Sequence, residues 1–189
     1  MHDRHLKLVV EYDGTDFAGW QVQPRQRTVQ GTLESAFGDL VDGEVRVAGA
    51  GRTDAGVHAL AMTAHADLES GLDAATIRDA VNSRLPDDVF LHEVSDAPSG
   101  FHARFSATAR EYVYLIGRTE SPVWRRHRWF VRGRLDDEAM LRSLEPLRGE
   151  HDFSSFCLSG SEPAHHRCRV DAISLECVPK HGGMIVFHI

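Results

Sequence analysis

The chain has 189 residues, of which 42% are hydrophobic and 26% are charged, and its net charge is −7. This length allows one domain or two small ones, and the composition is that of a globular protein and not of a disordered chain. No apolar run approaches the roughly 20 residues that a membrane-spanning helix needs. The three cysteines are an odd number in wide spacing, which is neither a disulfide framework nor a zinc pattern. We therefore expect a cytoplasmic protein with free thiols, no bound metal and no membrane partner.

Positive charge is concentrated between Phe101 and Arg134. This segment has eight arginines against two glutamates, a net charge of +6, whereas the rest of the chain carries −13. Guanidinium groups bind phosphates in bidentate geometry, so a local basic segment is compatible with nucleic-acid binding despite the negative total. Composition alone equally allows a solvated arginine-rich face.

The first half of the chain shows alternating and helical hydrophobic patterns in a regular order. Strand patterns end at turn residues, and the two helical patterns begin after the capping residues Thr28 and Asp73. The order β-α-β-β-α-β is the ferredoxin-like arrangement, and we assign it to a first domain, residues 1–98. The expected strands are 6–12, 44–48, 57–68 and 89–94.

The second half, residues 99–189, begins the same way. We expect strands at 110–117, 170–178 and 184–189, a helix capped by Asp136, and a long arginine-rich loop that contains Trp124 and Trp129. This order lacks the last helix and strand of a second ferredoxin-like unit, so the sequence predicts an incomplete second half.

One loop stands out between the expected strands at 44–48 and 57–68. Gly51 and Gly56 bracket a short polar cluster that consists of Arg52, Thr53 and Asp54. Glycine allows backbone angles that other residues avoid, so such a loop can present a reactive group from a rigid sheet. An isolated Asp-x-Gly is more typical of a simple turn.

This loop and four other stretches together resemble the tRNA pseudouridine synthase A (TruA) family. The resemblance implies two ferredoxin-like halves that form a continuous antiparallel sheet with a central RNA cleft. It implies a homodimeric isomerase that converts uridine to pseudouridine in the tRNA anticodon stem-loop, without cofactor or metal. The matching stretches are residues 12–21, 28–34, 49–60, 101–112 and 149–156, and the resemblance makes the last of them the loop after the later helix.

The resemblance assigns roles to individual residues. It makes Asp54 the essential carboxylate, which could add to the sugar C1′, attack C6 of the base or remove a sugar proton to give a glycal. Arg52 would help to flip the base, or contact a phosphate, and Tyr112 would lie against the uracil or pack as an ordinary strand residue. Trp20 and Gln21 are expected to pack and to fix a turn. Weaker candidates for RNA binding are His58, His102, Arg104 and Arg110.

One expected feature has no counterpart in this sequence. The family places an arginine beside the catalytic carboxylate, in a helix that would follow residue 189. An adjacent cation keeps a carboxylate ionised. The sequence therefore leaves two alternatives open, an active tRNA isomerase or a truncated relative that only binds tRNA.

Overall fold

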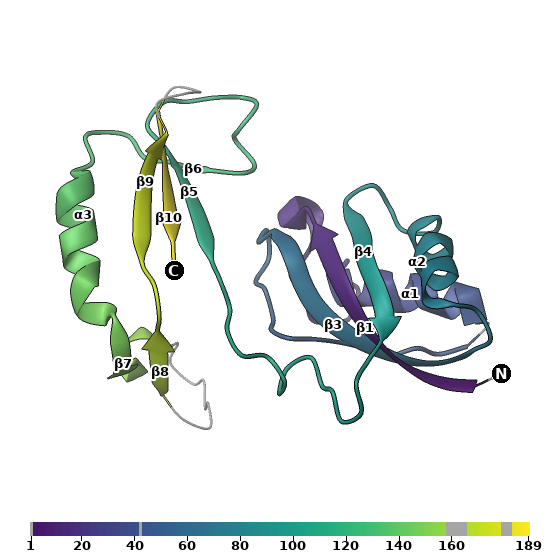
Figure 1. The fold of residues 1–189 in the computed structure, drawn as a ribbon. Coiled ribbons are helices and arrows are strands. Elements are labelled where there is room, and N and C mark those ends of the chain that lie inside the picture. Colours follow the sequence, from purple (N-terminus) through teal and green to yellow (C-terminus); the bar gives the residue numbers. More distant parts are fainter. Residues whose placement is uncertain (1, 42, 158–165, 179–182) are drawn as a thin grey trace. The chain divides into compact units, whose positions relative to one another are not determined.

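The computed structural model of the chain describes residues 2–41, 43–157, 166–178 and 183–189. The chain forms two compact units, Met1–Thr108 and Ala109–Ile189, which are described separately below. Both units combine helices with mainly antiparallel strands (Figure 1). The α+β class predicted from the sequence is therefore confirmed.

The first unit has the element order β-α-β-β-α-β, as the sequence predicts. Its four strands form a sheet in the order β2-β3-β1-β4, and all neighbouring strands are antiparallel. Its elements are β1 (His2–Tyr12), η1 (Gly14–Asp16), α1 (Val29–Val41), β2 (Val47–Gly49), β3 (Ala59–Ser70), α2 (Ala74–Asn82) and β4 (Val89–Asp96).

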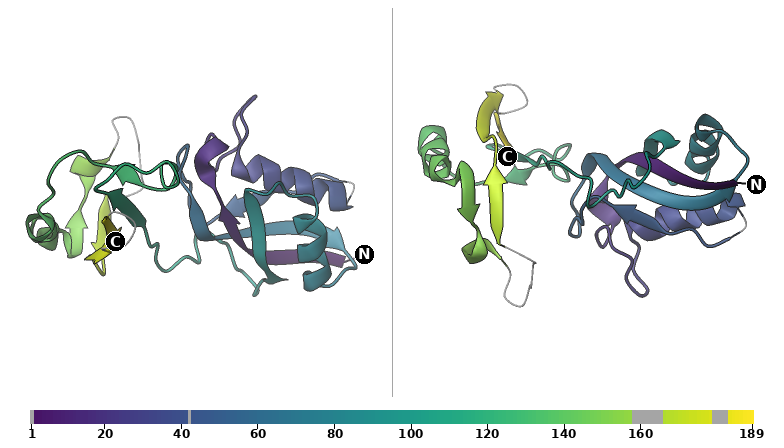
Figure 2. Two further views of the ribbon diagram at one scale, coloured as in Figure 1. Left: turned by 90° about the horizontal axis from the view of Figure 1, so that it is seen from above. Right: turned by 60° about the horizontal axis from the view of Figure 1, so that its bottom comes forward.

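The core of the first unit lies between the sheet and its two helices. Alternate residues of β1, namely Leu6, Leu8 and Val10, are fully buried, because successive side chains of a strand point to opposite faces. Buried residues of both helices join the same cluster, Phe37 among them. Both helices therefore cover one face of the sheet, and Figure 2 shows the twisted sheet beside them in two further views.

Three capping residues predicted from the sequence begin the helices. The Asp73 carboxylate accepts a hydrogen bond from the Thr76 N–H at 2.9 Å, and the Asp136 carboxylate accepts one from the Ala139 N–H at 2.8 Å. The Thr28 hydroxyl accepts the Gly31 N–H at 3.3 Å. Each side chain satisfies an amide that has no partner within its helix.

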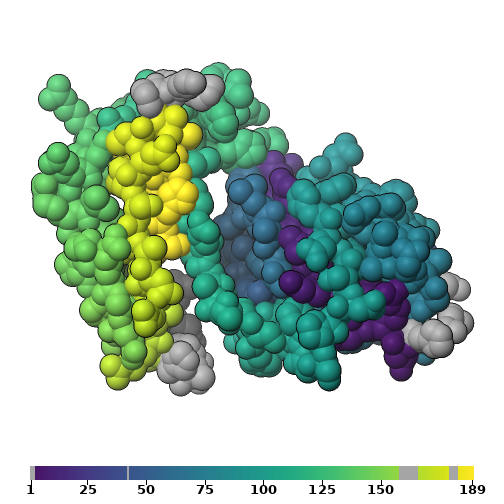
Figure 3. Space-filling model, in the orientation of Figure 1, coloured from purple at the N-terminus to yellow at the C-terminus, as the bar shows by residue number. Residues whose placement is uncertain are grey.

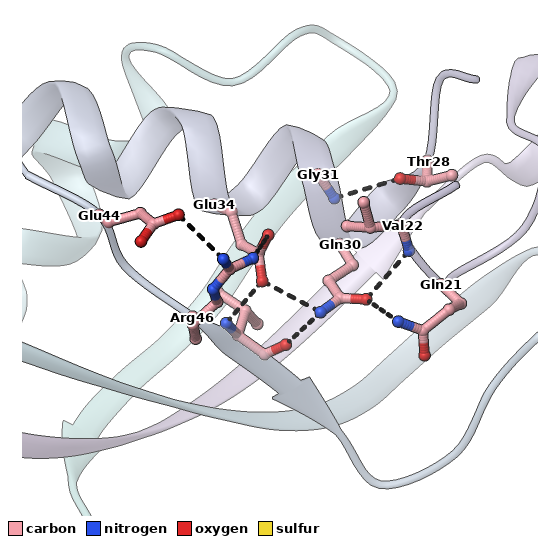
Figure 4. Close-up of polar contacts among 9 residues, drawn as sticks. Gln21, Val22, Thr28, Gln30, Gly31, Glu34, Glu44 and Arg46 are labelled. Carbon is pink, nitrogen blue, oxygen red and sulfur yellow. Dashed lines mark hydrogen bonds and ion pairs between the residues drawn. The ribbon is translucent and has the colours of Figure 1, made fainter. Parts of the chain in front are cut away.

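The outer edge of β2 is covered by side chains of α1 (Figure 4). The Gln30 side-chain amide donates to the Val47 carbonyl at 3.0 Å, and the Val47 N–H donates to the Glu34 carboxylate at 3.1 Å. The Gln30 carbonyl also accepts from the Gln21 side chain at 3.0 Å and from the Val22 N–H at 3.1 Å. Gln30 thus connects α1, the edge strand β2 and the segment that leads into α1.

The second unit has a different order from the one predicted. Strands β6-β5-β10-β9 form one sheet, in which β5 and β6 are parallel, and β7 and β8 form a separate antiparallel pair. Its elements are β5 (Val113–Gly117), β6 (Trp129–Phe130), α3 (Asp137–Leu144), η2 (Glu145–Leu147), β7 (Gly149–Asp152), η3 (Ser154–Phe156), β8 (Arg167–Val170), β9 (Ser174–Val178) and β10 (Met184–His188).

Three expectations for this unit were wrong in detail. The strand expected at 170–178 is divided, because the chain changes partner from β7 to β10 around the buried Ile173, whose carbonyl accepts a hydrogen bond from Arg148. The loop expected at 149–156 contains β7 and η3. Trp129, expected in a loop, lies in β6.

Arg128 has a structural role that the composition of the arginine-rich segment did not indicate. Its side chain is only 8% exposed and donates to the Thr119 carbonyl at 2.6 Å. It also packs on Gly117, where an added Cβ would lie 2.6 Å from the Arg128 Nε. At least one arginine of the basic segment is therefore part of the folded interior.

Candidate functional site

The loop between β2 and β3 carries the candidate carboxylate. Arg52 and Asp54 are exposed, whereas Gly51 and Thr53 are partly buried. Within the first unit, the loop therefore presents the Asp54 carboxyl group and the Arg52 guanidinium group to solvent, while Gly51 and Thr53 are more closely packed.

The backbone of this loop is hydrogen-bonded to the segment that follows β1. The Trp20 N–H donates to the Thr53 carbonyl at 2.9 Å, and the Gly56 N–H donates to the Phe17 carbonyl at 3.3 Å. The hydroxyl of the buried Tyr12 lies 2.9 Å from the Thr53 hydroxyl, and burial raises the Tyr12 pKa. Trp20 is itself buried, which agrees with the packing role expected for it.

Two glycines allow the segment after β1 to lie close to the Asp54 loop. A Cβ on Gly14 would lie 2.0 Å from the Val57 carbonyl oxygen, so no larger residue fits without moving the loop. Gly19 has a φ of +101°, in the region that favours glycine, and its Cβ would lie 2.7 Å from the Thr53 carbonyl oxygen. The segment 12–21 therefore supports the loop that carries Asp54.

His58 belongs to the same support. Its Nδ1 lies 2.9 Å from an Asp13 carboxylate oxygen and 3.2 Å from the Gly14 amide nitrogen. Both partners lie in the turn after β1, so the ring connects the end of the Asp54 loop to that turn. This geometry fits a positioning role better than that of a general base.

A second segment with candidate residues follows β4 and includes His102 and Arg104. Its backbone is attached to the sheet, because the Ala97 N–H donates to the His5 carbonyl at 2.8 Å and the buried Ala103 donates to His65 Nδ1 at 3.2 Å. Figure 3 shows this segment, in teal, against the first unit. Arg104 is exposed and His102 is partly buried.

Two histidines under this segment have opposite pKa shifts. Burial lowers the pKa of His65, and the neighbouring His102 and His5 lower it further, in agreement with an Nδ1 that accepts a hydrogen bond. The pKa of His5 is raised, first by its 2.6 Å hydrogen bond to Asp67 and then by the Phe101 carbonyl at 2.8 Å. The two rings that contact the segment therefore have pKa values shifted in opposite directions.

The remaining candidates lie in the second unit. Tyr112 is 49% exposed, and its backbone pairs with Ile189 through N–H···O bonds of 2.8 and 3.0 Å, just outside β5. Arg110 is exposed. The structure thus brings Arg52, Asp54 and His58 together on one loop and places Tyr112 and Arg110 in the other unit.

Several supporting residues were not singled out by the sequence. Tyr12 and Gly14 lie in a stretch that matched the family, but nothing in their own pattern shows that they contact the loop around Thr53 and Val57. His65 could have been noticed as a histidine in an otherwise alternating strand. Its contact with Ala103 joins residues 38 positions apart, which periodicity does not reveal.

The three cysteines are free and exposed. Cys157 Sγ lies 3.4 Å from His166 Nδ1, whereas the neighbouring His165 lies outside the described residues. Among the residues that the structure describes, no helix is long and apolar enough to span a bilayer.

The fold and the loop define a class of protein whose first unit is an antiparallel α+β domain with an exposed aspartate, Asp54, on a loop that is hydrogen-bonded to the segment after β1. A sequence profile described as tRNA pseudouridine synthase matches residues 8–106. The tRNA pseudouridine synthase A of Halalkalibacterium halodurans is 41% identical over 189 residues, covering 98% of this chain and 71% of the relative. The chain belongs to the tRNA pseudouridine synthase family.

Other relatives agree with this assignment. The tRNA pseudouridine synthase A of Geobacter sp. strain M21 is 43% identical over 155 residues, which cover 81% of this chain and 63% of the relative. That of Xanthobacter autotrophicus is 46% identical over 153 residues, which cover 79% of this chain and 62% of the relative. The matched part of the chain thus spans less than two thirds of these two relatives.

Proposed function

We propose that the chain is a tRNA pseudouridine synthase that isomerises uridine to pseudouridine in the anticodon stem-loop, with Asp54 as the essential carboxylate. The observation that carries the proposal is the loop itself, in which an exposed Asp54 stands on a backbone fixed by Trp20 and Phe17. Such fixation suits catalysis, since a reacting group must be held in a productive geometry.

The proposed reaction needs no oxidant or reductant. The N1–C1′ bond of the uridine breaks, the uracil turns, and a C5–C1′ bond forms. The proton on C5 is lost and N1 gains a proton, so the atoms and electrons of the nucleoside are conserved. A carboxylate can assist by adding to C1′, by adding to C6 or by removing a sugar proton.

The target base must leave its stack before Asp54 can reach it. Arg52, exposed two residues before Asp54, is proposed to occupy the vacated space or to hold a phosphate. Tyr112 is proposed to lie against the uracil. His58, His102, Arg104 and Arg110 are proposed to contact or support the RNA.

We further propose that the first unit is a ferredoxin-like half of the family's fold. The strand order β2-β3-β1-β4 and the β-α-β-β-α-β order of the first unit support this for that unit. We also propose that the protein is a cytoplasmic homodimer that acts on tRNA without a cofactor or a metal.

Pseudouridine mapping tests the function. The 189-residue chain is incubated with an unmodified tRNA transcript, and pseudouridine is located by chemical labelling. Labelled sites in the anticodon stem-loop are the expected result. Binding of the transcript without any labelled site would instead support a relative that only binds tRNA.

A further inference from the structure

Three rings stand next to one another between the interior of the first unit and its surface. The His65 ring, only 8% exposed, lies 4.5 Å from the His102 ring between centroids. The His102 ring lies 4.4 Å from the Phe105 ring, at an interplanar angle of 36°. Phe105 is 78% exposed, so the series begins in the sheet and ends in solvent.

The turn that carries Phe105 is well fixed. The Ser106 N–H donates to the His102 carbonyl at 2.8 Å, and the Ser106 hydroxyl accepts the His102 N–H at 3.0 Å. Between them, Ala103 is buried and its N–H donates to His65. The exposed phenyl ring is therefore held on a closed turn that is attached to β3.

The surroundings of Phe105 combine an apolar ring with positive charge. The guanidinium carbon of the neighbouring Arg104 lies 5.8 Å from the centre of the Phe105 ring, and Arg104 is exposed. A protein partner would match an apolar ring with an apolar surface. A nucleotide instead offers a flat base for the ring and a phosphate for the guanidinium.

We propose that Phe105 stacks on an unpaired nucleobase of the RNA substrate, as the outermost ring of the series His65, His102 and Phe105. The inference rests on the proposed function for the nature of the ligand, and it adds a base-contacting residue to the site. His65 and His102 act as positioning residues, because their rings support the phenyl ring from the sheet side.

The test measures binding of an unmodified tRNA transcript to Phe105→Ala and Phe105→Tyr over a series of salt concentrations. Loss of one base–aromatic stack costs about 1–3 kcal/mol, which corresponds to an affinity roughly 5- to 150-fold lower for Phe105→Ala. The slope of affinity against salt stays unchanged, since no phosphate contact is lost. Phe105→Tyr retains the ring and binds like the unaltered chain.

Phe156→Ala is the matched control. Phe156 is 72% exposed, in η3 of the second unit, so its removal deletes a phenyl ring of similar exposure. We expect its affinity and its thermal midpoint to match those of the unaltered chain. The thermal midpoint of Phe105→Ala should also be unchanged, because exposed substitutions alter stability by less than about 0.5 kcal/mol.

Equal affinity of Phe105→Ala and the unaltered chain would overturn the inference. Weaker binding by Phe105→Ala would also overturn it if the thermal midpoint of this variant fell, since Phe105 would then pack against another part of the protein.

Pseudouridine mapping of the unaltered chain tests the proposed function separately. Product formation with an unaffected Phe105→Ala affinity would refute the stacking alone, whereas absence of product with a Phe105-dependent affinity would refute only the isomerase.

Discussion

At the scale of single residues, the support of the Asp54 loop depends on the absence of side chains. The carbonyl of Val57 occupies the position that a Cβ on Gly14 would need, and the carbonyl of Thr53 does the same for Gly19. These approaches let backbone groups of the segment after β1 bond directly to the loop. The backbone of the loop that carries Asp54 is thus held by the backbone of the segment after β1.

Gly14→Ala is expected to displace the loop. The added Cβ would meet a backbone oxygen, which cannot rotate away as a side chain could. We predict a decrease in unfolding free energy of about 1–3 kcal/mol, as for other overpacked sites, together with a loss of isomerisation at temperatures where the protein is folded. Urea denaturation and pseudouridine formation measure the two effects.

Gly71→Ala is the matched control for that substitution. A Cβ on Gly71 would meet nothing within 4 Å. Its unfolding free energy should stay the same or rise by up to about 1 kcal/mol, since alanine restricts the unfolded chain. Similar losses in the two variants would show that the close approach at Gly14 is not the cause.

Some single residues could be predicted from sequence and others could not. Thr28, Asp73 and Asp136 were predicted as helix caps because a cap bonds to an amide two or three positions away. The need for glycine at position 14 arises from Val57, 43 residues further on, and only the folded chain brings the two together. A glycine in a sequence can therefore predict a turn, but it does not predict which distant residue packs against that turn.

At the scale of elements, β2 is a three-residue edge strand that leads directly into the Asp54 loop. An edge strand leaves backbone groups without strand partners, and here Gln30 and Glu34 of α1 bond to both backbone groups of Val47 (Figure 4). The helix thereby fixes the start of the loop, as the segment after β1 fixes its middle.

Gln30→Leu tests this contribution. The substitution leaves the carbonyl of the buried Val47 without its side-chain partner, and an unsatisfied buried polar group costs about 1–3 kcal/mol. We predict a loss of stability in that range, measured by urea denaturation. Ser35→Ala, an exposed position on the same helix, should change stability by less than about 0.5 kcal/mol; an equal loss there would contradict the role of Gln30.

The elements of the first unit were predictable because each has its own period and its own caps. The elements of the second unit were less predictable. The expected strand at 170–178 changes partner near Ile173, and pairing between strands is decided by tertiary contacts that a local pattern does not contain.

At the scale of the whole molecule, the candidate residues are distributed over both units. Arg52, Asp54 and His58 belong to the first unit, Arg110 and Tyr112 to the second. Family membership was recognisable from the ordered motifs, and the match over residues 8–106 confirms it. The sequence identified the loop around Asp54, but it did not show that the segment 12–21 supports this loop, because that role depends on backbone contacts between the two.

The most direct test of the account is the activity of Asp54→Ala compared with Asp39→Ala, another exposed aspartate of the first unit. Pseudouridine formed in an unmodified tRNA transcript is measured for both variants, together with the affinity for that transcript. We predict that Asp54→Ala forms no product but binds within about twofold of the unaltered chain, since phosphate contacts remain, and that Asp39→Ala is unaffected. Turnover retained by Asp54→Ala would contradict the account.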